Sequence, residues 1–242
     1  MTVFETKKIS QRRAAVIAGI TMLLMAICAA FAVGFVNSRL IVKGDASATV
    51  SNILNSLALF RSGILGWLLI LVSDVIVSWA LYSFLKQVDN SLALLGAWLR
   101  LIYCAILGAA IMNLIYVLQI LSGDKTFLAA AQPNQLNAQV MLFVNAFSKM
   151  WSFGLIVFGL HLLIISKLVL KSGFVPKILG ILLLIAALSY VIVHLLHVFL
   201  PQLEQTTVIL ENILSLPMAL GELAFGIWLL IKGGRTSKTA AH

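Results

Sequence analysis

The chain has 242 residues, of which 62% are hydrophobic and only 10% are charged. A soluble domain carries about 25% charged residues, so this chain has too little polar surface to cover a globule in water. Its two cysteines, Cys28 and Cys104, lie in separate apolar stretches and form neither a disulfide framework nor a paired metal motif. Composition therefore excludes a secreted disulfide-rich domain and predicts a membrane protein.

Six long apolar segments, each able to cross a bilayer, divide the chain. They are Ala14–Val36, Ser62–Leu85, Leu92–Leu121, Ala138–Ser166, Ile178–Leu200 and Thr207–Ile231. In lipid only helices or closed barrels satisfy the backbone, and these segments lack the two-residue alternation of barrel strands. We predict an all-α fold, a polytopic six-helix transmembrane bundle that makes a single domain over residues 1–242.

The first segment follows a basic stretch, as a signal peptide would. Its apolar run is far longer than the roughly 7–15 residues of a signal peptide, so we interpret it as a retained helix. Ala26, Ala30 and Gly34 recur every four residues along it. This stripe of small residues predicts close contact with a neighbouring helix.

Lysine and arginine predict the orientation, because they are more frequent in cytoplasmic segments. With the N-terminus inside, the inner segments hold Lys7, Lys8, Arg12, Arg13, Lys86, Lys167, Lys171, Lys177, Lys232, Arg235 and Lys238, and the outer links hold Arg39, Lys43, Arg61 and Lys125. Both termini are therefore predicted to be cytoplasmic, in an inner cell membrane. The net charge of +9 is explained by this asymmetry and by anionic membrane lipids as partners, so no nucleic acid is expected.

The links between the spans contain residues that typically begin or end helices. The segment Asp45–Leu59 is predicted to form an interfacial helix that leads into the second span. Its apolar residues at helical spacing are Ile53, Leu54 and Leu57, followed by Phe60. Asp89 is a predicted N-cap for the third span. Ser122–Asn137 is the longest outer link, and Pro133 is expected to interrupt it.

Ionisable residues interrupt four of the apolar segments: Asp74, Arg100, His161 and Glu222. Such a group at bilayer depth costs at least ~2.5–3.5 kcal/mol for Asp, Lys or Arg, so it usually faces a partner or a polar cavity. Their depths from the inner ends are ~16, ~12, ~10 and ~14 Å at the helical rise. We expect one cluster in the inner half, in which Arg100 neutralises at least one carboxylate. The cluster is also expected to hold one exchangeable proton. Ser78, one turn after Asp74, is a further candidate. Structural ion pairing, or an Arg100 that reaches the surface, are the alternatives.

A secondary candidate cluster lies toward the outer side and consists of Arg61, His194, His197 and Glu211. The two histidines share one face of the fifth span, which suggests zinc. Zinc catalysis usually needs three protein ligands around one point, however, and His161 lies near the opposite surface. We therefore predict no metal site, and histidines that are interfacial or hydrogen-bonded.

Sequence motifs of catalytic sites are missing from the chain. It has no Walker loop, no dinucleotide-binding glycine pattern, no GxSxG elbow and no HExxH pair. No serine has a histidine base at a readable spacing, so nucleophilic catalysis has no positive support. The sequence favours a protein without catalytic residues and without a cofactor.

Several short stretches together resemble a known family. They are Ser38-Arg39-Leu40, Gly44-Asp45, Leu59-Phe60-Arg61, Asp74, Leu99-Arg100-Leu101, Phe158-Gly159-Leu160-His161, Ser172–Gly180, Tyr190, Gly221-Glu222 and Trp228-Leu229-Leu230. Over residues 12–233 the pattern resembles a bacterial integral-membrane family, domain of unknown function 4386. The resemblance implies a single six-helix membrane domain and no particular activity. An acidic residue near Ser152 and a histidine near Phe147 are common in that pattern, and their loss here weakens a metal site in the fourth span.

Three hypotheses follow. The favoured one is a protein that binds or conducts a small polar or amphipathic ligand through an inner-half pocket, with coupling to protons. The second is an intramembrane, metal-dependent lipid hydrolase that would use His161, His194 or His197 with Asp74. The third is a structural or regulatory membrane protein without a ligand.

Overall fold

The computed structural model describes residues 10–123 and 132–234. Its elements are α1 (Gln11–Ala29), the π-helical η1 (Ala30–Asn37), α2 (Ser38–Leu40), α3 (Ala46–Asn55), α4 (Leu57–Leu85), α5 (Asn90–Ser122), α7 (Pro133–Lys171), α8 (Lys177–Phe199), the 3₁₀ turn η2 (Pro201–Leu203) and α9 (Glu204–Ile231). The segments α1, η1 and α2 continue one another, so this part of the chain contains six helices long and apolar enough to cross a membrane. The predicted six-helix, all-α fold is confirmed.

Large apolar side chains cover the outside of the bundle. Ile27, Leu142 and Ile213 are 68%, 64% and 65% exposed, and similar residues lie on every spanning helix. An apolar surface this continuous fits lipid rather than water. The chain is therefore a multi-pass membrane protein.

Some predicted boundaries need correction. α7 begins at Pro133 and not at Ala138. Proline is favoured in the first turn of a helix, where no N–H bond is lost, so Pro133 starts the fourth span instead of interrupting a link. Five of the counted charges, Lys7, Lys8, Lys125, Arg235 and Lys238, lie outside the described residues.

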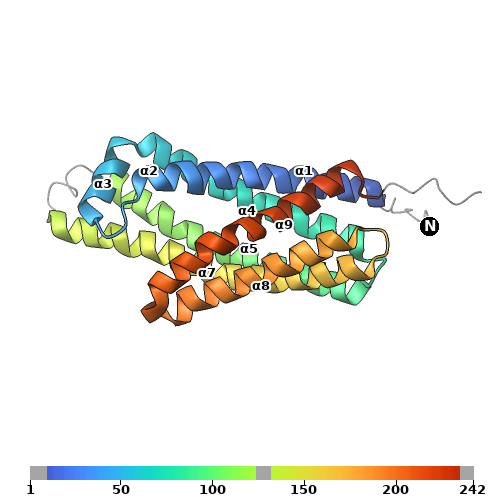
Figure 1. Cartoon of the computed structure of the whole chain (residues 1–242). Helices are drawn as coiled ribbons and strands as arrows, with labels where there is room; N and C mark the ends of the chain where they lie inside the picture. Colours follow the sequence, from blue (N-terminus) through green and yellow to red (C-terminus); the bar gives the residue numbers. More distant parts are fainter. Residues whose placement is uncertain (1–9, 124–131, 235–242) are drawn as a thin grey trace, which may run out of the picture.

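The two ends of the described chain lie at the same end of the bundle, which we call the terminal end (Figure 1). The links α2 and α3 lie at the opposite end. α9 crosses the other helices obliquely and packs against both α8 and α1 (Figure 1). This arrangement agrees with both termini on one side of the membrane, which the charge asymmetry predicts to be the cytoplasmic side.

Arg12 joins the first and last helices at the terminal end. Its Nη1 donates to the carbonyl oxygens of Leu229 and Gly233, at 3.2 and 2.9 Å, and its Nη2 donates to that of Leu230, at 2.7 Å. The last carbonyls of a helix have no partner within the helix, so an arginine there satisfies them and also complements the helix dipole. Arg12 is therefore a cap for α9 that comes from α1.

Close packing of α1 occurs at a different stripe from the predicted one. A Cβ on Gly19 would lie 2.7 Å from the carbonyl oxygen of Gly226 in α9. Ala30 and Gly34 are exposed, and a Cβ on Gly34 would meet nothing within 4 Å. The predicted stripe is wrong because η1 has a wider turn than an α-helix, so the α-helical spacing does not continue through it.

Aspartates cap two of the helices, and the cap at Asp89 was predicted. The Oδ1 atom of Asp45 accepts from the N–H of Ala48 at 2.8 Å and caps α3, the short helix before the second span. The Oδ1 atom of Asp89 accepts from the N–H of Leu92 at 3.1 Å, and its Oδ2 accepts from Nζ of Lys171 at 3.1 Å. The Leu92 N–H and the Lys171 ammonium hold the pKa of Asp89, which lies between spans, below its usual value.

Candidate functional site

Three of the predicted site residues meet at a buried arginine. Arg100 of α5 donates from Nε to Oδ1 of Asp74 in α4 at 2.8 Å, and its Nη2 lies 2.6 Å from the same oxygen. Its Nη1 lies 3.1 Å from Nε2 of His161 in α7. The side chains of Arg100 and Asp74 are 0% exposed. Arg100 therefore pairs with Asp74 inside the bundle and does not reach the surface.

The hydrogen bonds of His161 define its tautomer. Its Nδ1 lies 2.8 Å from the carbonyl oxygen of Gly96, which can only accept, so Nδ1 carries the hydrogen. Its Nε2 then accepts from Arg100, which can only donate. Both ring nitrogens are occupied. His161 supports the arginine and has no free nitrogen to offer a ligand or metal.

The guanidinium of Arg100 has further contacts on its remaining sides. Its Cζ lies 5.1 Å from the ring centroid of Phe158, a distance suited to a cation–π interaction. Its Nη2 lies 3.9 Å from the sulfur of Met25. Protein groups therefore surround the positively charged guanidinium of Arg100.

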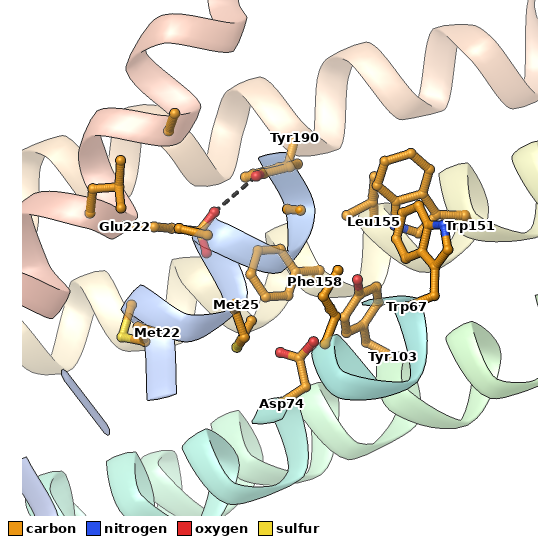
Figure 2. Close-up of a pocket in the computed structure, with 15 residues that line it drawn as sticks. Met22, Met25, Trp67, Asp74, Tyr103, Trp151, Leu155, Phe158, Tyr190 and Glu222 are labelled. Carbon is orange, nitrogen blue, oxygen red and sulfur yellow. Dashed lines mark hydrogen bonds between the residues drawn. The ribbon is translucent and has the colours of Figure 1, made fainter. Parts of the chain in front are cut away.

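Asp74 differs from Arg100 and His161 because one of its carboxylate oxygens has no hydrogen-bond partner among the described residues. Within the described part of the chain, Oδ2 of Asp74 is buried and has no hydrogen-bond partner. A buried polar atom without a partner costs about 1–3 kcal/mol, and more when it is charged. The atom belongs to a residue that lines a cavity, and Figure 2 shows the carboxylate directed into that space. The free oxygen therefore lies beside the cavity with no donor among the described residues, and a ligand there would reach it by displacing a lining side chain.

The cavity has a volume of about 310 Å³ and lies between all six spanning helices. Its lining is mostly apolar and aromatic, with two carboxyl groups. The lining residues are Met22, Met25, Ala26, Ala29, Trp67, Ile70, Asp74, Tyr103, Trp151, Leu155, Phe158, Tyr190, Ala219, Glu222 and Leu223. An apolar cavity with a few convergent polar groups is the usual form of a small-molecule site.

Glu222 of α9 lies on the other wall of the cavity from Asp74 (Figure 2). Its Oε1 accepts from the hydroxyl of Tyr190 in α8 at 2.9 Å. Among the described residues no Lys, Arg or His forms an ion pair with it. The structure thus brings Asp74 and His161 into direct contact with Arg100. Glu222 lies across the cavity from Asp74. Arg100 and His161 do not line the cavity themselves.

Ser78 lies outside the lining. Its hydroxyl donates to the carbonyl oxygen of Ala97 at 2.9 Å and so connects α4 to α5. A hydroxyl on the face of Asp74 was a reasonable candidate, but the facing helix supplies its acceptor. Ser78 is a packing residue.

The secondary outer cluster is only partly assembled. His197 lies 2.9 Å from Glu211 and 3.4 Å from Glu204, while His194 bonds through Nδ1 to the hydroxyl of Ser152 at 2.9 Å. Arg61 is exposed and makes no hydrogen bond or ion pair with any residue that the structure describes. In residues 10–123 and 132–234, no three His, Cys, Asp or Glu side chains gather in a way that could hold a metal ion.

Sequence reasoning missed the aromatic wall. Five rings line the cavity: Trp67, Tyr103, Trp151, Phe158 and Tyr190. Helical spacing could have indicated part of it. Trp151, Leu155 and Phe158 recur at i, i+4 and i+7 on α7, and Trp67 lies two turns before Asp74 on α4. Met22 and Met25 had no such signal, because α1 carries no ionisable residue in its apolar part.

Fold and site together define a multi-pass membrane protein with a buried Asp–Arg–His cluster beside an acidic, aromatic cavity. The chain belongs to the family described as Domain of unknown function (DUF4386), which matches residues 17–233. An uncharacterized protein from Archaeoglobus fulgidus is 30% identical over 178 residues, which cover 74% of this chain and 88% of that relative. No solved structure matches the chain.

Proposed function

We propose that this protein, resident in the inner cell membrane, binds one small amphipathic ligand in the cavity between Asp74 and Glu222. The observation that carries the proposal is the unpaired Oδ2 of Asp74, buried in the cavity wall. A hydrogen-bond donor on the ligand would satisfy that oxygen, and a bond to a charged group is worth about 1.5–3 kcal/mol. The ligand therefore needs a group that stabilises this oxygen, either a hydrogen-bond donor or a positive charge.

The rest of the lining sets the character of the ligand. Outside the two carboxyl groups the walls are aromatic rings, methionines and aliphatic side chains. A volume of about 310 Å³ is at the small end of ligand pockets, which span about 300–1,000 Å³. A compact molecule with an apolar body and a polar end fits both features.

Entry from the bilayer is the route that the lining supports. Ala219 of α9 both lines the cavity and is exposed, and Ala26 and Ala29 on α1 are half-buried. The neighbours Leu216 and Leu220 are 64% and 49% exposed, so the surface beside Ala219 is apolar. A molecule dissolved in the membrane would reach the cavity between α1 and α9.

The two alternatives have less support. A purely structural cluster is expected to pair both carboxylate oxygens, whereas Asp74 has one that no described residue pairs. A metal-dependent hydrolase would need His161, His194 or His197 near Asp74. His161 has both nitrogens occupied, while His194 bonds to Ser152 and His197 to Glu211. Two carboxyl groups against one guanidinium leave room for one more positive charge, which is the basis for proton coupling.

A cavity-filling variant with a matched control tests the proposal. Ala26→Phe places a ring in the cavity, while Ala30→Phe adds the same ring one turn away at an exposed position outside the lining. Three benzyl compounds, with cationic, neutral and anionic ends, are titrated into protein in lipid nanodiscs. We expect saturable binding of at least one compound to the native protein and to Ala30→Phe, with at least tenfold weaker binding to Ala26→Phe. Equal binding to both variants, or none to the native protein, would overturn the proposal.

A further inference from the structure

We propose that the ligand is an organic cation, an amine or quaternary ammonium with an apolar body. This inference rests on the proposed function and specifies its ligand class. Its basis is the combination of an unpaired buried carboxylate oxygen, a second carboxyl group on the opposite wall, and the aromatic rings between them.

The charges that reach the cavity are acidic. Asp74 and Glu222 line it, and neither Arg100 nor His161 does. Arg100 is 0% exposed, and its three guanidinium nitrogens contact Asp74, His161 and Met25. It is not available to an anion in the cavity. An anionic ligand would meet two carboxyl groups and no cation, whereas a positive ligand would complete the charge balance.

The aromatic walls favour the same sign of charge. Five rings surround the space: Trp67, Tyr103, Trp151, Phe158 and Tyr190. The face of an aromatic ring attracts a cation, by about 0.5–1 kcal/mol when exposed and about 2 kcal/mol or more when desolvated. Several rings around one cavity are the arrangement that proteins use for quaternary ammonium groups. Figure 2 shows the rings of Tyr103 and Phe158 beside the carboxylate of Asp74.

Their mutual packing keeps these rings in place. Trp67 and Trp151 meet edge to face with centroids 4.8 Å apart. Phe158 contacts Tyr103 and Tyr190, with centroid distances of 5.1 and 5.3 Å. Such pairs contribute about 0.5–1.5 kcal/mol beyond their buried area. The cage is therefore formed before a ligand arrives, which lowers the entropic cost of binding.

Two probes of matched shape and opposite charge test the inference. Benzyltrimethylammonium and phenylmethanesulfonate share the benzyl group and a tetrahedral end, and differ in sign. Each is titrated by equilibrium dialysis into full-length protein in phosphatidylcholine nanodiscs, with empty nanodiscs as the blank. The cation is expected to bind at one site per chain, at least tenfold more tightly than the anion.

Carboxyl variants assign the site. Glu222→Gln retains an acceptor for Tyr190 and removes the ionisable carboxyl group, so cation binding should weaken at least tenfold. Glu211→Gln removes a carboxylate eleven residues earlier on the same helix, outside the lining, and should leave binding unchanged. Asp74→Asn should weaken binding at least as much as Glu222→Gln, and Glu222→Gln carries the test if Asp74→Asn fails to fold.

The outcomes separate this inference from the proposed function. Cation binding that is lost in Glu222→Gln and kept in Glu211→Gln supports both. Saturable binding of the anion or of neutral benzyl alcohol, blocked by Ala26→Phe but without preference for the cation, overturns the ligand class and leaves the proposed function standing. No saturable binding of any of the three compounds overturns both.

Discussion

Arg100 places Nε and Nη2 on the same oxygen of Asp74, at 2.8 and 2.6 Å, instead of bridging both carboxylate oxygens. A parallel two-oxygen pairing is the common arrangement for arginine and a carboxylate. Here Nη1 is used by His161, and Oδ2 of Asp74 remains free in the cavity wall. The ion pair thus fixes the carboxylate and still leaves one oxygen for a ligand.

Substitution of Arg100 and substitution of Asp74 should lower the stability of the fold by different amounts. Arg100→Ala strands a buried carboxylate, which typically costs about 3–5 kcal/mol. Asp74→Asn keeps an acceptor oxygen for the guanidinium, so it should destabilise the fold less than Arg100→Ala does. It should nevertheless reduce ligand binding more than Arg100→Ala. The double variant should be more stable than the sum of the single losses implies. Thermal unfolding of all four proteins in one detergent measures these differences, and an additive double variant would argue against the ion pair.

His161 should be found as a single neutral tautomer. Its Nδ1 donates to the carbonyl of Gly96 and its Nε2 accepts from Arg100. Nitrogen NMR of ¹⁵N-histidine-labelled protein should show one residue with a protonated Nδ1 and an unprotonated Nε2. That signal should vanish in His161→Gln and persist in His194→Gln. A doubly protonated ring at His161 would contradict the geometry.

Two glycines on the first span provide a matched test of packing. Gly19→Ala would place its Cβ 2.7 Å from backbone atoms of Gly226 and Leu230 in α9. Such overpacking should cost about 1–3 kcal/mol. Gly34→Ala has open space at the same atom and should be neutral or slightly stabilising. Unfolding midpoints of the two variants are the measurement, and equal midpoints would mean that α1 and α9 do not meet at Gly19.

Orientation in the membrane can be tested independently of the site. Reporter fusions after His242 and within the link between Lys171 and Lys177 should report the cytoplasm. A fusion at Pro133 should report the outside. An external C-terminus would contradict the charge asymmetry and the even number of spans.

The sequence predicted the fold because lipid imposes a strong constraint. Each span had to be a long apolar helix, so the six segments could be recognised from composition alone. Asp74, Arg100 and Glu222 were recognisable for the same reason, since charges are rare at that depth. Their depths along separate helices also predicted that Arg100 could meet Asp74.

The rest of the site depends on how each helix is rotated about its axis, which packing determines and the residue pattern does not. The stripe of Ala30 and Gly34 was predicted to face a neighbour and is exposed, because η1 interrupts the α-helical spacing. Aromatic residues are ordinary in membrane helices, so the helical spacing of Trp67 and Trp151 was not enough by itself to single them out. Arg61 was placed near the outer histidines by depth alone, and the structure leaves it apart from them.

The most direct test of the central claim is an experimental structure of the protein in lipid with benzyltrimethylammonium bound. We predict density for the cation inside the aromatic cage, with its ammonium group between Oδ2 of Asp74 and the carboxyl group of Glu222. A primary amine analogue, benzylamine, should bring its nitrogen within about 2.7–2.9 Å of Oδ2. A cavity closed by side chains, with Oδ2 bonded to a protein donor and the cation elsewhere, would contradict the account.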